Sequence, residues 1–148
     1  MTETKGFVHT RTVRFGECDP AGVAYYPTFF NWFHQAMEAC FEEWVGTPYA
    51  TIIQKTGFPA VQTSADFHRP LSVGSVIDVV VQIATIGRSS VEWRFDIYRR
   101  IPGKSSVLSA TGKVKTVCIA VDDGHFAFAS VPVPEMVRSR LEGLLIEP

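Results

Sequence analysis

Residues 27–45 restrict the possible folds of this chain most strongly, because they predict a helix that is apolar on most of its surface. Apolar side chains recur at steps of three and four residues, and others extend the apolar surface further round: Phe29, Phe30, Phe33, Met37, Cys40, Phe41 and Trp44, then Trp32, Ala36 and Ala39. Pro27 suits the first turn of a helix, and Gly46 followed by Pro48 is a typical stop signal. A helix of roughly 18 residues is about 27 Å long, so it would cross a whole small domain.

After this helix the apolar residues recur at every second position, which predicts β-strands with one dry and one solvated face. The clearest example is VEWRFDIYR, residues 91–99, and similar patterns predict strands at 7–14, 60–69, 75–87, 106–121 and 125–133. Short turns rich in glycine, proline and aspartate separate these strands, which indicates antiparallel neighbours. Shorter helices are expected at 49–55 and 134–145.

One long buried helix with an antiparallel sheet of five to six strands predicts an α+β domain in which the sheet wraps round the helix. A chain of 148 residues is expected to form a single domain, residues 1–148. A single curved sheet cannot cover a helix that is apolar all round. We therefore expect the uncovered side of the helix and the exposed sheet edge to pack against a second copy of the chain.

The charge balance and the cysteines narrow the classes of partner and compartment. There are 14 basic and 15 acidic side chains, with a net charge of -1, so neither nucleic acid nor a membrane surface is expected as a partner. Three scattered cysteines do not make a disulfide framework, and none pairs with a histidine at metal-site spacing. No signal peptide or membrane span is recognised, so we expect a cytoplasmic protein without a bound metal.

The segment FGECDPAGVAYYPTFFNWF, residues 15–33, contains the main candidates for chemistry. Asp19 has two open interpretations. It is either a loop carboxylate that accepts hydrogen bonds from backbone amides, since Asp before Pro is an ordinary turn signal, or part of a pocket in which Gly22 lets a ligand approach the main chain. Backbone N–H groups around Tyr25 and Tyr26 could point at an oxyanion while the carboxylate faces the same carbon. An acyl-transfer site needs those two groups, and no pattern supports a serine or cysteine nucleophile.

This segment resembles the signature of the 4-hydroxybenzoyl-CoA thioesterase family of hotdog-fold proteins, with the aspartate, proline, alanine, glycine and tyrosine–proline step in register. Residues 66–79, DFHRPLSVGSVIDV, resemble the family's Arg-Pro pair and following strand. The resemblance implies a hotdog fold, hydrolysis of an aromatic acyl-CoA without a cofactor, and a homodimer at least, with a homotetramer expected.

The resemblance also implies roles for individual residues. Asp19 matches the family's catalytic carboxylate, which either attacks the thioester carbonyl or activates water, and Tyr26 matches the residue whose backbone N–H polarises that carbonyl. Gly22 and Tyr25 are expected to lie against the substrate. The helix aromatics are expected mainly in the core, although Trp32 is assigned to the acyl site.

Four further positions are interpreted from resemblance to hotdog proteins. His34 occupies a position where the 4-hydroxybenzoyl enzyme carries an acid, so it is either an interior histidine or a polar acyl-pocket residue that changes the preferred ring substituent. Glu38 is a second candidate base. Arg88 and Ser89 lie in a turn that resembles the family's CoA-phosphate turn. Arg88 replaces a basic cluster there, so either CoA is held more weakly or other arginines contribute: Arg69, Arg99, Arg100 or Arg138 of a neighbouring chain.

Three functions therefore compete. The first is an acyl-CoA thioesterase acting on a 4-hydroxybenzoyl-like or benzoyl-like thioester. The second is a thioesterase for short aliphatic acyl-CoA or acyl carrier protein, and the third is a non-catalytic acyl-CoA-binding module.

Overall fold

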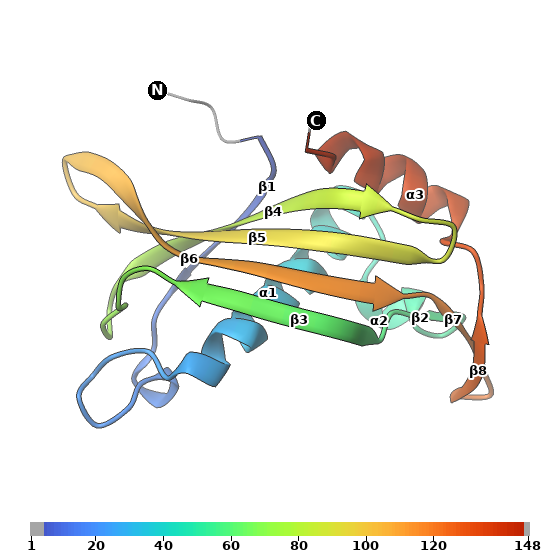
Figure 1. Cartoon of the computed structure of the whole chain (residues 1–148), viewed down its shortest axis with the longest axis horizontal. Coiled ribbons are helices and arrows are strands. Elements are labelled where there is room, and N and C mark those ends of the chain that lie inside the picture. The colour runs from blue at the N-terminus through green and yellow to red at the C-terminus, as the bar shows by residue number, and fades with distance from the viewer. Residues whose placement is uncertain (1–4, 147–148) are drawn as a thin grey trace.

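The computed structural model describes residues 5–146 and consists of a long helix covered on one side by an antiparallel sheet (Figure 1). The helix, α1, comprises Tyr26–Cys40. The sheet has five strands in the order β1 (Phe7–Thr12), β4 (Val76–Ile86), β5 (Ser90–Ile101), β6 (Lys104–Val117) and β3 (Ala60–Phe67). Every neighbouring pair in this sheet is antiparallel. The predicted α+β class is confirmed.

The prediction of one continuous strand at 106–121 is wrong, because the chain leaves the large sheet at Cys118. The Cys118 N–H donates to the Ser89 carbonyl at 2.7 Å, and its own carbonyl accepts from the Val131 N–H at 2.9 Å. The chain then enters a second sheet of three strands: β2 (Thr56–Gly57), β7 (Ile119–Asp122) and β8 (His125–Ser130).

The predicted long helix is present, but its last part is not α-helical. Residues Phe41–Val45 form a π-helical turn, η2, which ends at Gly46 with a left-handed φ of +91°. The two shorter helices are also shorter than predicted. They are α2 (Tyr49–Ile52) and α3 (Glu135–Leu141), the second followed by a 3-10 turn, η3 (Glu142–Leu144). No helix within residues 5–146 is both long and apolar enough to cross a bilayer.

The core lies between one side of α1 and the concave face of the sheet. The buried helix side chains are Phe29, Trp32, Phe33, Ala36, Met37 and Cys40. The sheet contributes the inward residues of β5 that the alternation predicted: Val91, Trp93, Phe95 and Ile97. The rings of Phe33 and Phe95 stack with centroids 5.0 Å apart. On the opposite side of α1, the side chains of Tyr26, Asn31, His34 and Glu38 are exposed, so one side of the helix is uncovered in the single chain.

At Gly112, β6 lies directly against a side chain of α1. A Cβ atom placed there would lie 2.3 Å from the ring of Phe33, which is itself buried. The missing side chain of Gly112 therefore makes room for an aromatic ring of α1, and the sequence gives no sign of this contact.

Gly112→Ala should lower the free energy of unfolding by about 1–3 kcal/mol, because the added methyl group must displace the Phe33 ring. Denaturant unfolding measures the change. Gly16→Ala is the matched control, since nothing lies within 4 Å of the position that its Cβ would occupy, and its effect should stay within about 0.5 kcal/mol. Equal effects of the two substitutions would contradict the close contact.

Candidate active site

Asp19 begins a tight turn in the loop that leads into α1. The Gly22 N–H donates to the Asp19 carbonyl at 2.9 Å, and Gly22 has a left-handed φ of +77°. Aspartate first, proline second and glycine fourth is the residue preference of a type I turn. The Asp19 Oδ1 also accepts from the N–H groups of Ala21 at 2.9 Å and Val23 at 3.3 Å. The loop-carboxylate interpretation of Asp19 therefore describes one of its oxygens correctly.

The second carboxylate oxygen, Oδ2 of Asp19, has no hydrogen-bond donor among residues 5–146, and the side chain is exposed. The turn thus holds the carboxylate by one oxygen and leaves the other available to a ligand. A carboxylate in this state can act as a nucleophile or as a base.

The start of α1 offers a single available N–H donor. The Tyr25 N–H donates to the Glu17 carbonyl at 2.9 Å, Pro27 has no N–H, and the Thr28 N–H donates to the Tyr25 carbonyl at 2.8 Å. The Tyr26 N–H has no acceptor within the described part of the chain. Such a donor at a helix N-terminus can stabilise a negative oxygen. The prediction of donors around Tyr25 and Tyr26 therefore narrows to Tyr26.

The loop also packs against the segment after β3. The Ala24 N–H donates to the Leu71 carbonyl at 2.7 Å, and the Val73 N–H donates to the Gly22 carbonyl at 3.0 Å. A depression of about 300 Å³ lies beside this contact, at the helix start. Its lining includes Tyr26 and Arg69.

Glu17, which the sequence analysis did not single out, holds the loop to the helix and to β1. Its Oε2 accepts from the indole N–H of Trp32 at 2.8 Å and from the Arg11 guanidinium, and its Oε1 accepts from the Arg14 N–H at 2.8 Å. Burial raises the pKa of this carboxyl group, but the hydrogen bonds from Arg14 and Trp32 and the charge of Arg11 outweigh burial, so the pKa lies below its ordinary value. The only local signal was its position three residues after Arg14, where it bonds back to the Arg14 N–H.

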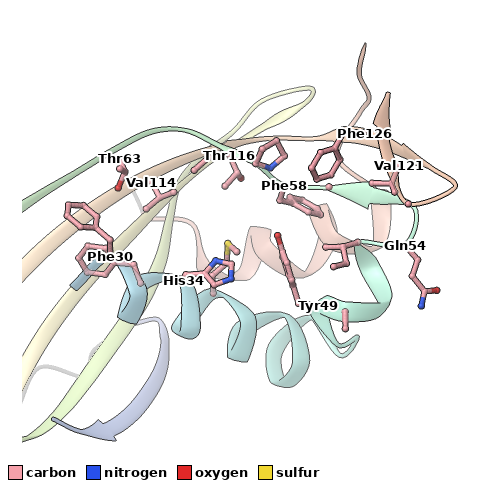
Figure 2. Close-up of a pocket in the computed structure, with 18 of the residues that line it drawn as sticks. Phe30, His34, Tyr49, Gln54, Phe58, Thr63, Val114, Thr116, Val121 and Phe126 are labelled. Atoms are coloured by element: carbon pink, nitrogen blue, oxygen red, sulfur yellow. The ribbon is translucent and has the colours of Figure 1, made fainter. Parts of the chain in front are cut away.

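A cavity of about 950 Å³ lies between α1 and strands β3 and β6, and extends towards the β7–β8 hairpin (Figure 2). Its lining is mostly apolar and includes Phe30 and Phe33 of α1, Phe58, Val114 of β6, and Val121 and Phe126 of the hairpin. Tyr26, Phe30 and His34 follow one another at steps of four residues on the same helix face, over about 12 Å. Tyr26 lines the smaller depression at the helix start, and the cavity begins one helical turn further on, at Phe30.

His34 and Tyr49 are the principal polar groups at the helix side of this cavity (Figure 2). Their ring centroids lie 5.8 Å apart, and His34 Nε2 lies 3.4 Å from Glu38 Oε1. Burial, aided by the negative charge of Glu38, raises the pKa of Tyr49, which keeps its hydroxyl group protonated. Within the single chain His34 is not an interior residue, because half of its side chain is exposed.

The remaining predicted site residues lie elsewhere. Trp32 is fully buried in the core and bonds to Glu17. Arg88 and Ser89 lie in the turn between β4 and β5. This turn is at the opposite end of the molecule from the start of α1 (Figure 1). Arg88 is not the only basic residue at this turn, because Arg138 Nη2 of the same chain donates to the carbonyls of Gly87 at 2.5 Å and Arg88 at 3.3 Å. Arg100 forms a salt bridge with Asp78: its Nε donates to Oδ2 at 2.8 Å and its Nη2 donates to Oδ1 at 2.9 Å.

One chain therefore brings Asp19, Gly22, Tyr25 and Tyr26 together, continues from them to His34, and leaves Arg88 remote. Within residues 5–146 no group of three or more His, Cys, Asp or Glu side chains is placed to hold a metal ion.

Comparison with known proteins finds several curated relatives of this chain, and two of them are described here. A 1,4-dihydroxy-2-naphthoyl-CoA hydrolase from Prochlorococcus marinus (strain NATL2A) is 33% identical over 94 residues, which cover 57% of this chain and 60% of the relative. A 4-hydroxybenzoyl-CoA thioesterase from Pseudomonas sp. (strain CBS-3) is 29% identical over 94 residues, which cover 62% of this chain and 67% of the relative. The first of these matches spans less than two thirds of the relative's length.

A solved structure and a family model complete the comparison. The structure of a 1,4-dihydroxy-2-naphthoyl-CoA thioesterase from Synechocystis matches with a TM-score of 0.76 and 25% identity, covering 91% of this chain and 94% of the other. The hotdog fold that the resemblance implied is confirmed. The family model described as thioesterase superfamily matches residues 21–106, more than half of the 148 residues. This chain therefore belongs to the thioesterase superfamily.

Proposed function

We propose that this protein is an acyl-CoA thioesterase that hydrolyses an aromatic acyl-CoA to the free acid and CoA. The observation that carries the proposal is the pair of unoccupied groups at one loop, the Asp19 Oδ2 and the Tyr26 N–H. Relatives named as hydrolases of 1,4-dihydroxy-2-naphthoyl-CoA and 4-hydroxybenzoyl-CoA support the choice of an aromatic acyl group.

In the proposed mechanism the thioester carbonyl oxygen accepts a hydrogen bond from the Tyr26 N–H. The Asp19 carboxylate then either attacks the carbonyl carbon, so that CoA thiolate leaves and water hydrolyses the mixed anhydride, or removes a proton from an attacking water molecule. In both routes the oxygen becomes negative as the tetrahedral intermediate forms, and one such donor is worth about 10²- to 10³-fold in rate. No metal or organic cofactor is required by either route.

The acyl group is proposed to occupy the cavity along α1. Its volume of about 950 Å³ lies within the range of pockets for drug-sized ligands. The polar groups at its helix side, His34 and Tyr49, could bind a ring hydroxyl while the apolar part of the lining contacts the faces of the ring system. Gly22 and Tyr25 are proposed to lie near the thioester. Trp32 is proposed to make no contact with the acyl group and to support the site only as part of the core, because its side chain is fully buried.

CoA binding gives a reason to propose a homodimer. That two such dimers form a homotetramer is proposed from the resemblance to the family alone. The CoA-phosphate role implied for Arg88 and Ser89 requires this turn to lie within reach of the pantetheine arm of a CoA whose thioester is at the Asp19 loop, yet one chain places the turn and the loop at opposite ends of the molecule (Figure 1). A partner chain could supply this turn. The candidate contact is β3, an edge strand on which Val61 is 60% exposed and Phe67 is 48% exposed.

Asp19→Asn should reduce kcat by about 10²- to 10⁴-fold, because an amide is neither a nucleophile nor a base of comparable strength. The asparagine oxygen can still accept the Ala21 N–H, so fold and CoA affinity should be unchanged. Release of thiol from 4-hydroxybenzoyl-CoA measures the rate, and Asp122→Asn, on β7, is the matched control. Wild-type turnover in Asp19→Asn would refute the mechanism, and CoA binding without any turnover by the wild type would favour the non-catalytic binding module.

A substrate panel should show the highest kcat/KM for hydroxylated aromatic acyl-CoA, with butyryl-CoA at least about tenfold lower, because a small aliphatic group leaves the cavity unfilled. His34→Ala should reduce the preference for hydroxylated over unsubstituted rings, while Asn31→Ala, an exposed neighbour on α1, should not. A preference for butyryl-CoA or for acyl carrier protein would favour the second of the three functions.

Light scattering should give a mass of at least twice the 16.4 kDa of one chain. Val61→Lys on β3 should shift the protein towards the mass of a single chain, because it places a charge on the proposed contact. Val8→Lys tests the opposite edge strand, β1, and should leave the mass unchanged. A single-chain mass for the wild type would exclude the homodimer.

A further inference from the structure

The loop that contains Asp19 is held at both ends by one residue, Glu17. Glu17 lies immediately before the loop and is separated from the start of α1 by residues 18–25. Its side chain bonds to the body of the domain, and its backbone carbonyl bonds to the far end of the loop. These two sets of contacts have different consequences.

The side-chain contacts anchor Glu17 itself. The Oε2 atom accepts from Trp32 Nε1 at 2.8 Å and from the Arg11 guanidinium. The Cζ atom of Arg11 also lies over the Trp32 ring, 5.3 Å from the ring centroid. Little of either charged side chain is accessible, 16% for Arg11 and 17% for Glu17. Arg11 also donates to Gln35 of α1. The carboxylate is thus bound to β1 and to the second turn of α1 through charge-assisted hydrogen bonds, which are short and directional.

The backbone carbonyl of Glu17 holds the other end of the loop. It accepts from the Tyr25 N–H at 2.9 Å and from the Thr28 hydroxyl group at 3.2 Å. The first contact occupies the N–H immediately before Tyr26, and the second comes from the first turn of α1. The peptide plane that contains the Tyr26 N–H also contains the Tyr25 carbonyl, which accepts from the Thr28 N–H at 2.8 Å. The Glu17 carbonyl therefore acts on this plane through both of its bonded partners, Tyr25 and Thr28.

We propose that Glu17 is a positioning residue that fixes the Asp19 carboxylate and the Tyr26 N–H relative to each other. This inference rests on the proposed function, because the roles of Asp19 and Tyr26 belong to that proposal. Glu17 itself is assigned no contact with the substrate. A displacement of about 1 Å in a reacting group can cost about 10²-fold in rate, so a residue that closes the loop can control kcat without touching the thioester. The lowered pKa of Glu17 is consistent with an ionised carboxylate at neutral pH.

The test compares Glu17→Gln with Glu42→Gln, an exposed glutamate in η2 that makes no hydrogen bond or ion pair among the described side chains. The glutamine retains the size of Glu17 and one acceptor but loses the charge that binds Arg11. We expect kcat for 4-hydroxybenzoyl-CoA to fall about 10- to 100-fold with KM within about twofold, measured well below the Tm of each variant. Glu42→Gln should match the wild type. A lowered Tm with unchanged kcat would show a purely structural role and overturn the proposal.

Two further variants keep the proposal testable if Glu17→Gln folds poorly. Thr28→Val removes only the hydroxyl donor to the Glu17 carbonyl and should lower kcat about three- to tenfold with little change in KM; an unchanged kcat would count against the proposal. In an Asp19→Asn background, Glu17→Gln should add much less than it does alone, because groups that act as a unit are not additive. A full additional loss would mean that Glu17 acts independently of Asp19 and would overturn the proposal.

Amide hydrogen exchange separates failure of this inference from failure of the proposed function. Glu17→Gln should accelerate exchange at the Tyr25 and Ala21 N–H groups at least about tenfold, since both belong to the loop that Glu17 holds. If the wild type hydrolyses no acyl-CoA, the proposed function fails, while faster exchange in Glu17→Gln would still show that Glu17 holds the loop. If exchange is unchanged, Glu17 does not hold the loop and the positioning role is wrong, whatever the activity.

Discussion

A single five-stranded sheet can cover only one side of α1, and the other features of the molecule follow from this constraint. The covered side forms the core, where Phe33 stacks on Phe95 and Gly112 leaves room for the ring. The other side exposes Tyr26 and His34, and a cavity of about 950 Å³ lies at the border of the two sides, between α1 and strands β3 and β6. The same geometry provides both an available binding surface and a reason for a partner chain.

The loop before α1 shows how ordinary local chemistry can prepare a reactive group. Asp19 satisfies the amides of its own turn with one oxygen, which fixes the carboxylate, and leaves the other oxygen accessible. Tyr26 keeps an available N–H because it is the first residue of α1, where no preceding turn of helix supplies an acceptor. The turn interpretation and the proposed catalytic interpretation of Asp19 are therefore compatible, since the first positions the carboxylate that the second requires.

Glu17 links this loop to the domain and was not identified by sequence reasoning. Its partners Arg11 and Trp32 are six and fifteen residues away in sequence, on a strand and on a helix. Nothing in a local pattern distinguishes such a glutamate from a solvated one. Arg138 illustrates the same limit, because its contact with the Gly87–Arg88 turn joins residues about fifty positions apart.

The sequence by itself determined the α+β class, the long helix, the alternating strands and the loop that bears Asp19, because periodicity and turn preferences are local properties of the chain. It did not determine where the strand after residue 117 changes sheets, that Trp32 belongs to the core, or that His34 borders a cavity. It also did not place Arg88 far from Asp19. Those outcomes depend on hydrogen bonds and packing between distant segments, which exist only once the sheet has closed over the helix.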